Sequence, residues 1–113
     1  MHELGIMYHV VEQVLRIAAG NGLTQVDTLV LQVGELSSVI PHYLEACFPA
    51  AVDGTLLEKT KLSIEVLPAN GLCSSCGKVF GLVEHHRTCP HCGGREYETL
   101  SGSEFYIKEI VAC

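Results

Sequence analysis

The sequence predicts an α+β fold: a three-stranded sheet with two helices on one face, plus an inserted lobe that carries four cysteines. Two segments show the apolar repeat of an amphipathic helix, and three show the alternation of a half-buried strand. The cysteines lie between the second and third of those strands. At 113 residues, the chain is long enough for one small domain with a satellite.

The first helix is expected over residues 4–19, where apolar side chains recur at helical spacing. These side chains are Leu4, Met7, Tyr8, Val11, Val14, Leu15 and Ala18. Gly20-Asn21-Gly22 should end the helix, because Gly favours the position just after a helix C-terminus. Residues 26–33 then have the alternation of a strand.

The second helix is expected to begin at Pro41, with Ser37 or Ser38 as its N-cap. Pro49 lies inside its apolar stripe and should kink or shorten it, since proline cannot donate a helical hydrogen bond. Gly54 should close it.

Residues 62–66 and 104–111 are the second and third strands, and 68–71 has the composition of a linker. Strands that flank a compact insertion often pair antiparallel, so we expect these two strands to be neighbours. The exposed face of the sheet is only partly polar, so a partner or a swapped copy of the chain could cover it.

The most specific motif is a pair of Cys-x-x-Cys sequences, Cys73/Cys76 and Cys89/Cys92, each followed by Gly. Four thiolates suit a tetrahedral Zn²⁺ ion, and few apolar residues lie between the pairs to hold a lobe otherwise. We therefore expect a closed, structural zinc site whose binding energy also folds the lobe. Two disulfides, a rubredoxin-like iron site and a thioredoxin-type redox pair are the alternatives.

Composition and charge favour a soluble cytoplasmic protein that does not bind nucleic acid or membrane. The formal net charge is −6, whereas nucleic-acid binders usually carry a basic patch. No stretch has the pattern of a signal peptide, and none reaches the roughly 18 apolar residues of a membrane span. No arrangement of nucleophile and base, phosphate loop or carboxylate pair indicates an enzyme.

Met1-His2-Glu3 is the second candidate metal site. A large residue at position 2 should protect Met1 from removal. The α-amine, the His2 amide nitrogen and the His2 imidazole could then chelate one ion in fused rings, with a Glu3 amide or carboxylate as the fourth donor. Planar nitrogen coordination suits Ni(II) or Cu(II). Against this, the N-terminus of a helix carries partial positive charge, which Glu3 offsets in part. A solvated terminal histidine is the alternative.

Other histidines and cysteines are expected to have ordinary roles. His85, His86 and His91 lie in or between the cysteine pairs, where they could replace a thiolate or sense pH, although exposure on a loop is the simpler interpretation. His9 and His42 should be exposed, although His9 could supply an extra ligand at the amino-terminal site. Cys47 should be a small core residue, and Cys113 a free terminal thiol.

Taken together, these stretches resemble the HypA/HybF family of hydrogenase nickel incorporation proteins. The resemblance rests on Met1-His2-Glu3-Leu4, Val33–Ser37, Gly54–Leu56 with Lys61–Glu65, the two cysteine pairs with Cys89-Pro90, and Gly102–Glu104. It covers nearly the whole chain in order. The cysteine pairs alone are common to many zinc ribbons, and their combination with Met-His-Glu at residue 1 is specific.

The resemblance implies a nickel metallochaperone of NiFe-hydrogenase maturation. Nickel would be bound by Met1, His2 and Glu3, and zinc by Cys73, Cys76, Cys89 and Cys92. The implied partners are a HypB-type GTPase and the hydrogenase large subunit, with urease as a further target in some members. The implied domains are a discontinuous nickel-binding domain, 1–70 and 99–113, and a zinc-binding domain, 71–98. The protein would be a monomer or a weak, domain-swapped dimer.

Three other functions remain open from the sequence. They are a zinc-ribbon module that binds nucleic acid or protein, a rubredoxin-like electron carrier, and a hydrolase that uses the amino-terminal metal. An open coordination position would be needed for the last.

Overall fold

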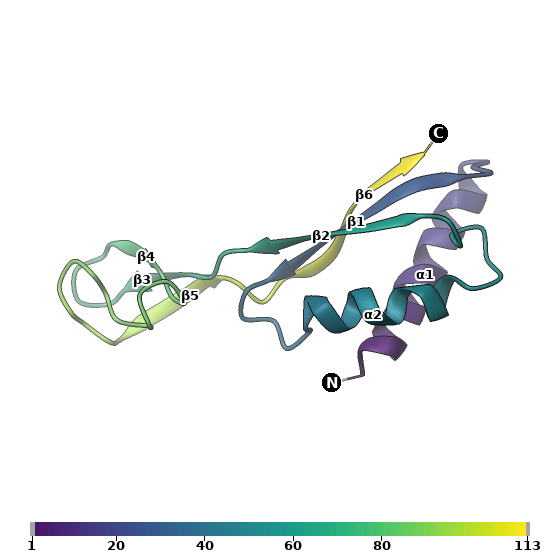
Figure 1. Ribbon diagram of the computed structural model, residues 1–113. Helices are drawn as coiled ribbons and strands as arrows, with labels where there is room; N and C mark the ends of the chain where they lie inside the picture. The colour runs from purple at the N-terminus through teal and green to yellow at the C-terminus, as the bar shows by residue number, and fades with distance from the viewer. Residues whose placement is uncertain (1, 113) are drawn as a thin grey trace. The chain divides into compact units, whose positions relative to one another are not determined.

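A computed structural model gives the structure of residues 2–112, which form two compact units. The first unit comprises residues 2–32, 38–65 and 106–112, and the second comprises Val33–Ser37 and Val66–Phe105. The first holds two helices and most of a three-stranded sheet, and the second holds a smaller three-stranded sheet and the four paired cysteines (Figure 1). The predicted fold class, α+β with a cysteine lobe, is confirmed. No helix among the described residues has the length and apolar character to cross a membrane.

Helix α1 spans Glu3–Gly20, one residue longer at each end than predicted. Its buried residues follow the helical repeat: Glu3, Met7, Val10, Val11, Val14 and Ala18. Leu4 and Tyr8 follow the same spacing in the sequence but are exposed, so the buried face is narrower than predicted. The helix ends as expected, because Gly22 takes a positive φ of 65° and the Leu23 N–H donates to the Ala18 carbonyl.

Helix α2 spans Pro41–Val52, and Pro49 does not shorten it. Proline at this position leaves the Glu45 carbonyl without its helical donor, but both residues are exposed and water can satisfy that oxygen. The predicted serine caps are wrong. The N-cap is Ile40, and its own side chain cannot accept a hydrogen bond.

The main sheet has the strand order β2-β1-β6, formed by Lys61–Leu67, Val26–Gly34 and Phe105–Ala112. The predicted pairing of β2 with β6 is wrong, because β1 lies between them. Thr60 Oγ1 donates to the Val26 carbonyl and Gln32 Nε2 to Glu65, so β1 and β2 run in the same direction. Parallel neighbours need a crossover, and α2 supplies it. The buried run Leu29–Leu31 suits the central strand.

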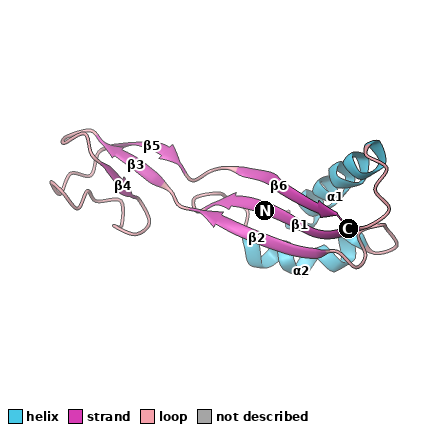
Figure 2. Cartoon of the chain, turned by 90° about the horizontal axis from the view of Figure 1, so that it is seen from above, coloured by secondary structure: helices cyan, strands magenta, loops and turns pink. Residues whose placement is uncertain are grey.

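Both helices lie on one face of this sheet, as predicted (Figures 1 and 2). Met7, Val14 and Leu44 from the helices and Leu29 and Leu31 from the sheet are almost completely buried. On the edge strands, Glu65 and Lys108 form an exposed ion pair of 3.0 Å; the hydrogen bond from Gln32, and next the one from Lys108, lower the pKa of Glu65. The buried residues of α1 begin at Glu3, so the helix packs on the core of the first unit from its first turn onward.

The second unit contains a sheet with the order β4-β3-β5, formed by Val79–Gly81, Asn70–Cys73 and Tyr97–Ser101. Both pairings are antiparallel. The predicted linker at 68–71 is partly wrong, because β3 begins at Asn70. A side chain at Gly71 would meet Leu82 at 2.6 Å, so glycine there serves close packing inside a strand.

Replacing Gly34 by Ala should destabilise the second unit. A Cβ at Gly34 would overlap the backbone carbonyl of Gly102, where the Leu36 N–H donates at 2.7 Å. Backbone cannot move aside as a flexible side chain can, so the expected cost is about 1–3 kcal/mol or more. Chemical denaturation of the metal-loaded protein measures it.

Gly5→Ala is the matched control. No heavy atom lies within 4 Å of a Cβ built there, and alanine is favoured over glycine in a helix by roughly 0.5–1 kcal/mol. Equal stability of Gly34→Ala and the parent would contradict the close backbone approach.

Candidate metal centre

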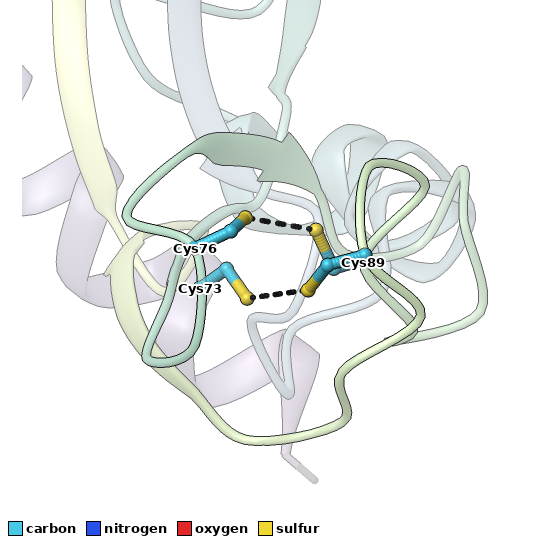
Figure 3. Close-up of side chains that lie close together, drawn as sticks. Cys73, Cys76 and Cys89 are labelled. Atoms are coloured by element: carbon cyan, nitrogen blue, oxygen red, sulfur yellow. Dashed lines mark hydrogen bonds between the residues drawn. The ribbon is translucent and has the colours of Figure 1, made fainter.

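Two similar turns bring the four paired cysteines together. Their sulfurs all lie within 4.8 Å of one another. Cys73 and Cys92 are 3.5 Å apart, and Cys76 and Cys89 are 3.6 Å apart, so each contact joins one pair to the other. Figure 3 shows the side chains of Cys73, Cys76 and Cys89 converging from opposite loops.

The spacing of the sulfurs fits a single tetrahedral ion. A tetrahedron with Zn–S bonds of about 2.3 Å has sulfur–sulfur edges of about 3.8 Å. The two contacts of 3.5 and 3.6 Å are slightly shorter than this value, and the upper limit of 4.8 Å is about 1 Å longer. A small outward adjustment of the turns would accept the ion. The four cysteines therefore form a metal-binding cluster that can supply all four ligands of a tetrahedral ion.

The two turns have the same hydrogen-bond pattern. In the first, the Cys73 N–H donates to Lys78 and the Gly77 N–H donates back to Cys73, both at 2.9 Å. In the second, Cys89, Gly93 and Gly94 repeat these bonds at 2.8 Å. The pattern requires a left-handed residue four positions after the first cysteine, and Gly77 and Gly93 supply φ of 72° and 76°. The Gly after each pair was the signal for this geometry.

Backbone N–H groups also point at the sulfurs. The pKa of Cys73 is lowered to about 6, chiefly by a hydrogen bond from the Cys76 N–H. Burial opposes this effect, and a hydrogen bond from the Ser75 N–H adds to it. Gly94 donates to Cys92, but the adjacent Cys73 sulfur and burial outweigh it and raise the pKa of Cys92 to about 12. The turns thus favour a thiolate at Cys73, the form that binds metal. The sequence did not reveal these individual donors.

The three histidines of this unit do not join the cluster. Among residues 2–112, the four cysteines are the one group of His, Cys, Asp and Glu whose ligand atoms converge on a possible ion. His86 and His91 are exposed, as expected, and His85 is half-buried beside Glu84, with 3.9 Å between Nε2 and Oε2. His86 and Arg87 take positive φ of 52° and 61°, a strained turn that the sequence did not predict.

The amino terminus is described from His2 onward, and Met1 lies outside the described residues. His2 is exposed at the start of α1, and its carbonyl accepts the Ile6 N–H at 3.1 Å. Glu3 is buried, with 7% of its surface exposed, and its Oε2 accepts the Ile40 N–H at 3.4 Å. Sequence reasoning missed this contact, because it joins residues 37 positions apart and no local pattern marks it.

The remaining candidates lie as the sequence suggested, with one difference. His9 and His42 are exposed. Cys47 is half-buried on α2 and is less enclosed than a core residue. Cys113 lies outside the described residues.

Comparison with known proteins identifies the family. A family model described as "Hydrogenase/urease nickel incorporation, metallochaperone, hypA" matches residues 1–112. The hydrogenase maturation factor HypA of Geobacter metallireducens is 40% identical over 110 residues, which is 97% of each chain. The HypA of Streptomyces avermitilis is 38% identical over 112 residues, covering 97% of this chain and 86% of that one.

Solved structures show the same fold. The solution structure of the nickel metallochaperone HypA from Helicobacter pylori matches with a TM-score of 0.68 and 18% identity, over 99% of this chain and 97% of that chain. A second HypA solution structure matches with a TM-score of 0.71 and 17% identity, over 100% and 97%. The whole-length match of the family model and the identity to curated relatives agree, and the chain belongs to the HypA family of nickel incorporation metallochaperones.

Proposed function

We propose that this protein binds Ni(II) at its amino terminus and delivers it to the large subunit of NiFe-hydrogenase. Its membership of a nickel incorporation family acting in hydrogenase maturation carries this proposal. The match includes residue 1, and His2 is exposed at the very start of α1. A site there would be reachable both for an incoming ion and for the receiving protein.

The proposed nickel donors are the Met1 amine, the His2 amide nitrogen and the His2 imidazole, with Glu3 completing the set. In this proposal nickel is delivered to another protein, so its binding must be reversible. Three donors from consecutive atoms of one short backbone need little ordering of the chain. A deprotonated amide is an anionic ligand, so it offsets the partial positive charge at the start of α1.

The proposed ion at Cys73, Cys76, Cys89 and Cys92 is structural zinc. Four protein thiolates leave no open position, which fits a structural site and not a catalytic one. The nickel-binding domain of this proposal comprises 1–70 and 99–113, and the zinc-binding domain comprises 71–98. The cluster would fold the second domain, and the first would carry the cargo.

Delivery would involve the other hydrogenase maturation proteins. A HypB-type GTPase is the proposed partner in nickel transfer, and the large subunit is the proposed recipient. We propose that the protein acts in the cytoplasm without catalytic turnover, as a monomer or a weak, domain-swapped dimer. The net charge of −6 supports a protein partner over a nucleic acid.

Removing the His2 imidazole should abolish nickel binding and leave zinc in place. On protein with an authentic Met1, we expect a Ni²⁺ titration by calorimetry to give one nickel per chain. His2→Ala should lose this nickel, because the substitution removes the imidazole donor and the chelate ring that it closes around the ion. Zinc content, measured by elemental analysis, should stay at one per chain in both proteins.

The control variant is His9→Ala, which removes an exposed imidazole from the same helix and should bind nickel as the parent does. Two extra residues before Met1 should act like His2→Ala, since they move the amine away. Equal nickel binding by the parent and His2→Ala would refute the amino-terminal site and favour a zinc-ribbon binding module.

Replacing Cys76 by Ser should release zinc and unfold the second unit while the first unit keeps its helices. A hydroxyl is a much weaker ligand than a thiolate, and the small core of the second unit depends on the metal. Zinc content and helical circular dichroism measure the two effects. Cys47→Ser, a half-buried cysteine of α2 far along the sequence from the pairs, should retain full zinc; zinc retention by Cys76→Ser would contradict the four-cysteine site.

Mild acidification should release nickel before zinc. An α-amine ordinarily has a pKa of about 7.7–8.0 and an imidazole about 6.5, and both must be unprotonated to bind metal. Nickel affinity should therefore fall by roughly tenfold or more per pH unit between neutral pH and pH 6. Titrations at several pH values, each with a zinc assay, check this order; a pH-independent nickel affinity would count against these donors.

A further inference from the structure

We propose that the Glu3 side chain positions the nickel-binding terminus by holding the start of α2, and that its carboxylate does not bind nickel. The proposal rests on the proposed nickel site and concerns how the fold supports it. In this proposal, the backbone of Glu3 remains a possible nickel donor, whereas its side chain contacts the start of α2.

The burial of Glu3 is the first observation. Glu3 and Thr60 are the two buried polar or charged residues of the described chain, and Glu3 is 7% exposed. A carboxylate in such a place must be paired, because an unpaired buried charge is costly. Its Oε2 accepts the Ile40 N–H at 3.4 Å. Moving the carboxylate out to an ion at the exposed His2 would break this contact.

The side-chain acceptor at the start of α2 comes from another helix, which is the second observation. Ile40 is the N-cap, and no side chain of its own caps the helix. Pro41 follows it and has no N–H group, so the Ile40 N–H is the backbone donor immediately before the helix. The Glu3 carboxylate accepts this N–H from α1.

The charge of Glu3 also suits its place. It lies in the first turn of α1 and accepts a hydrogen bond at the start of α2, so it meets the positive ends of two helix dipoles. Both ends would repel a nickel ion bound at the adjacent residues. A carboxylate fixed beside them offsets this repulsion without taking a coordination position.

The contact of Glu3 with Ile40 would restrict the backbone at the nickel-binding terminus. His2 precedes Glu3 directly, and the His2 carbonyl already accepts the first hydrogen bond of α1. With the Glu3 side chain tied to Ile40, the path of the chain at His2 is fixed from two helices. The donors at the terminus then lose less freedom when they bind an ion, which raises affinity.

The test compares nickel binding by the parent, Glu3→Gln and Glu3→Ala, all with an authentic Met1. Gln keeps an oxygen that can accept the Ile40 N–H, whereas Ala cannot. We expect Glu3→Gln to bind nickel within a few-fold of the parent and Glu3→Ala to bind roughly tenfold more weakly. The visible absorption spectrum of bound nickel, which reports its ligands, should be the same in all three.

A second measurement follows the contact itself. Amide hydrogen exchange, read by NMR on the metal-free amino terminus with zinc retained, should show the Ile40 N–H protected in the parent and in Glu3→Gln, and faster in Glu3→Ala. Glu12→Ala is the matched control. Glu12 is an exposed acid of the same helix that pairs with Arg16 at 2.7 Å, and its loss should change neither measurement.

Each outcome decides between the roles. A changed nickel spectrum in both Glu3 variants would show that the carboxylate is a ligand and would overturn the proposal. Parent-like affinity in Glu3→Ala would overturn it as well. If the parent and His2→Ala bind nickel equally, the proposed function fails instead, and the exchange of the Ile40 N–H still tests whether Glu3 holds α2.

Discussion

The convergence of four sulfurs within 4.8 Å is the constraint on which the second unit depends. Its buried cluster has five members, Ala69, Cys73, Phe80, Leu82 and Cys89, and two of them are proposed ligands. The core and the metal site therefore share Cys73 and Cys89. An unloaded lobe would keep three buried apolar side chains, which is too little to offset the entropy of ordering the loops around them. If zinc binds there as proposed, metal binding and folding of this unit would be one process.

Local patterns in the sequence predicted local structure well. The repeat of Met7, Val11 and Val14 gave α1, and the spacing of the cysteine pairs gave the cluster, because each pattern reports geometry within a few residues. Strand order was not predictable in this way. The position of β1 between β2 and β6 follows from the crossover through α2, a relation between segments that alternation alone does not encode.

The errors have two causes: a contact between distant residues, and strands too short to show a pattern. Ser37 and Ser38 have the composition of an N-cap, but Glu3 supplies the acceptor for Ile40 from the other helix. The short strands of the second unit escaped notice because β4 has three residues and β3 contains Gly71, so neither shows a period of two over a useful length. Donor chemistry made Met1-His2-Glu3 a candidate metal site, but the resemblance was needed to favour it over a solvated terminal histidine, since a histidine at position 2 carries no distinguishing pattern by itself.

The two candidate sites differ in how accessible a bound ion would be. The cysteine cluster offers four ligands from fixed turns: Cys73 and Cys89 are buried, Cys76 and Cys92 are exposed, the turns have matched hydrogen bonds, and N–H groups favour the thiolate at Cys73. An ion held by all four thiolates would have no open coordination position for an incoming ligand. The terminus offers donors on an exposed residue at the first turn of a helix, and only its base is anchored. An ion bound there would be open to approach by an incoming ligand, so the exposure of the proposed nickel donors suits exchange, whereas a four-thiolate site suits a structural ion.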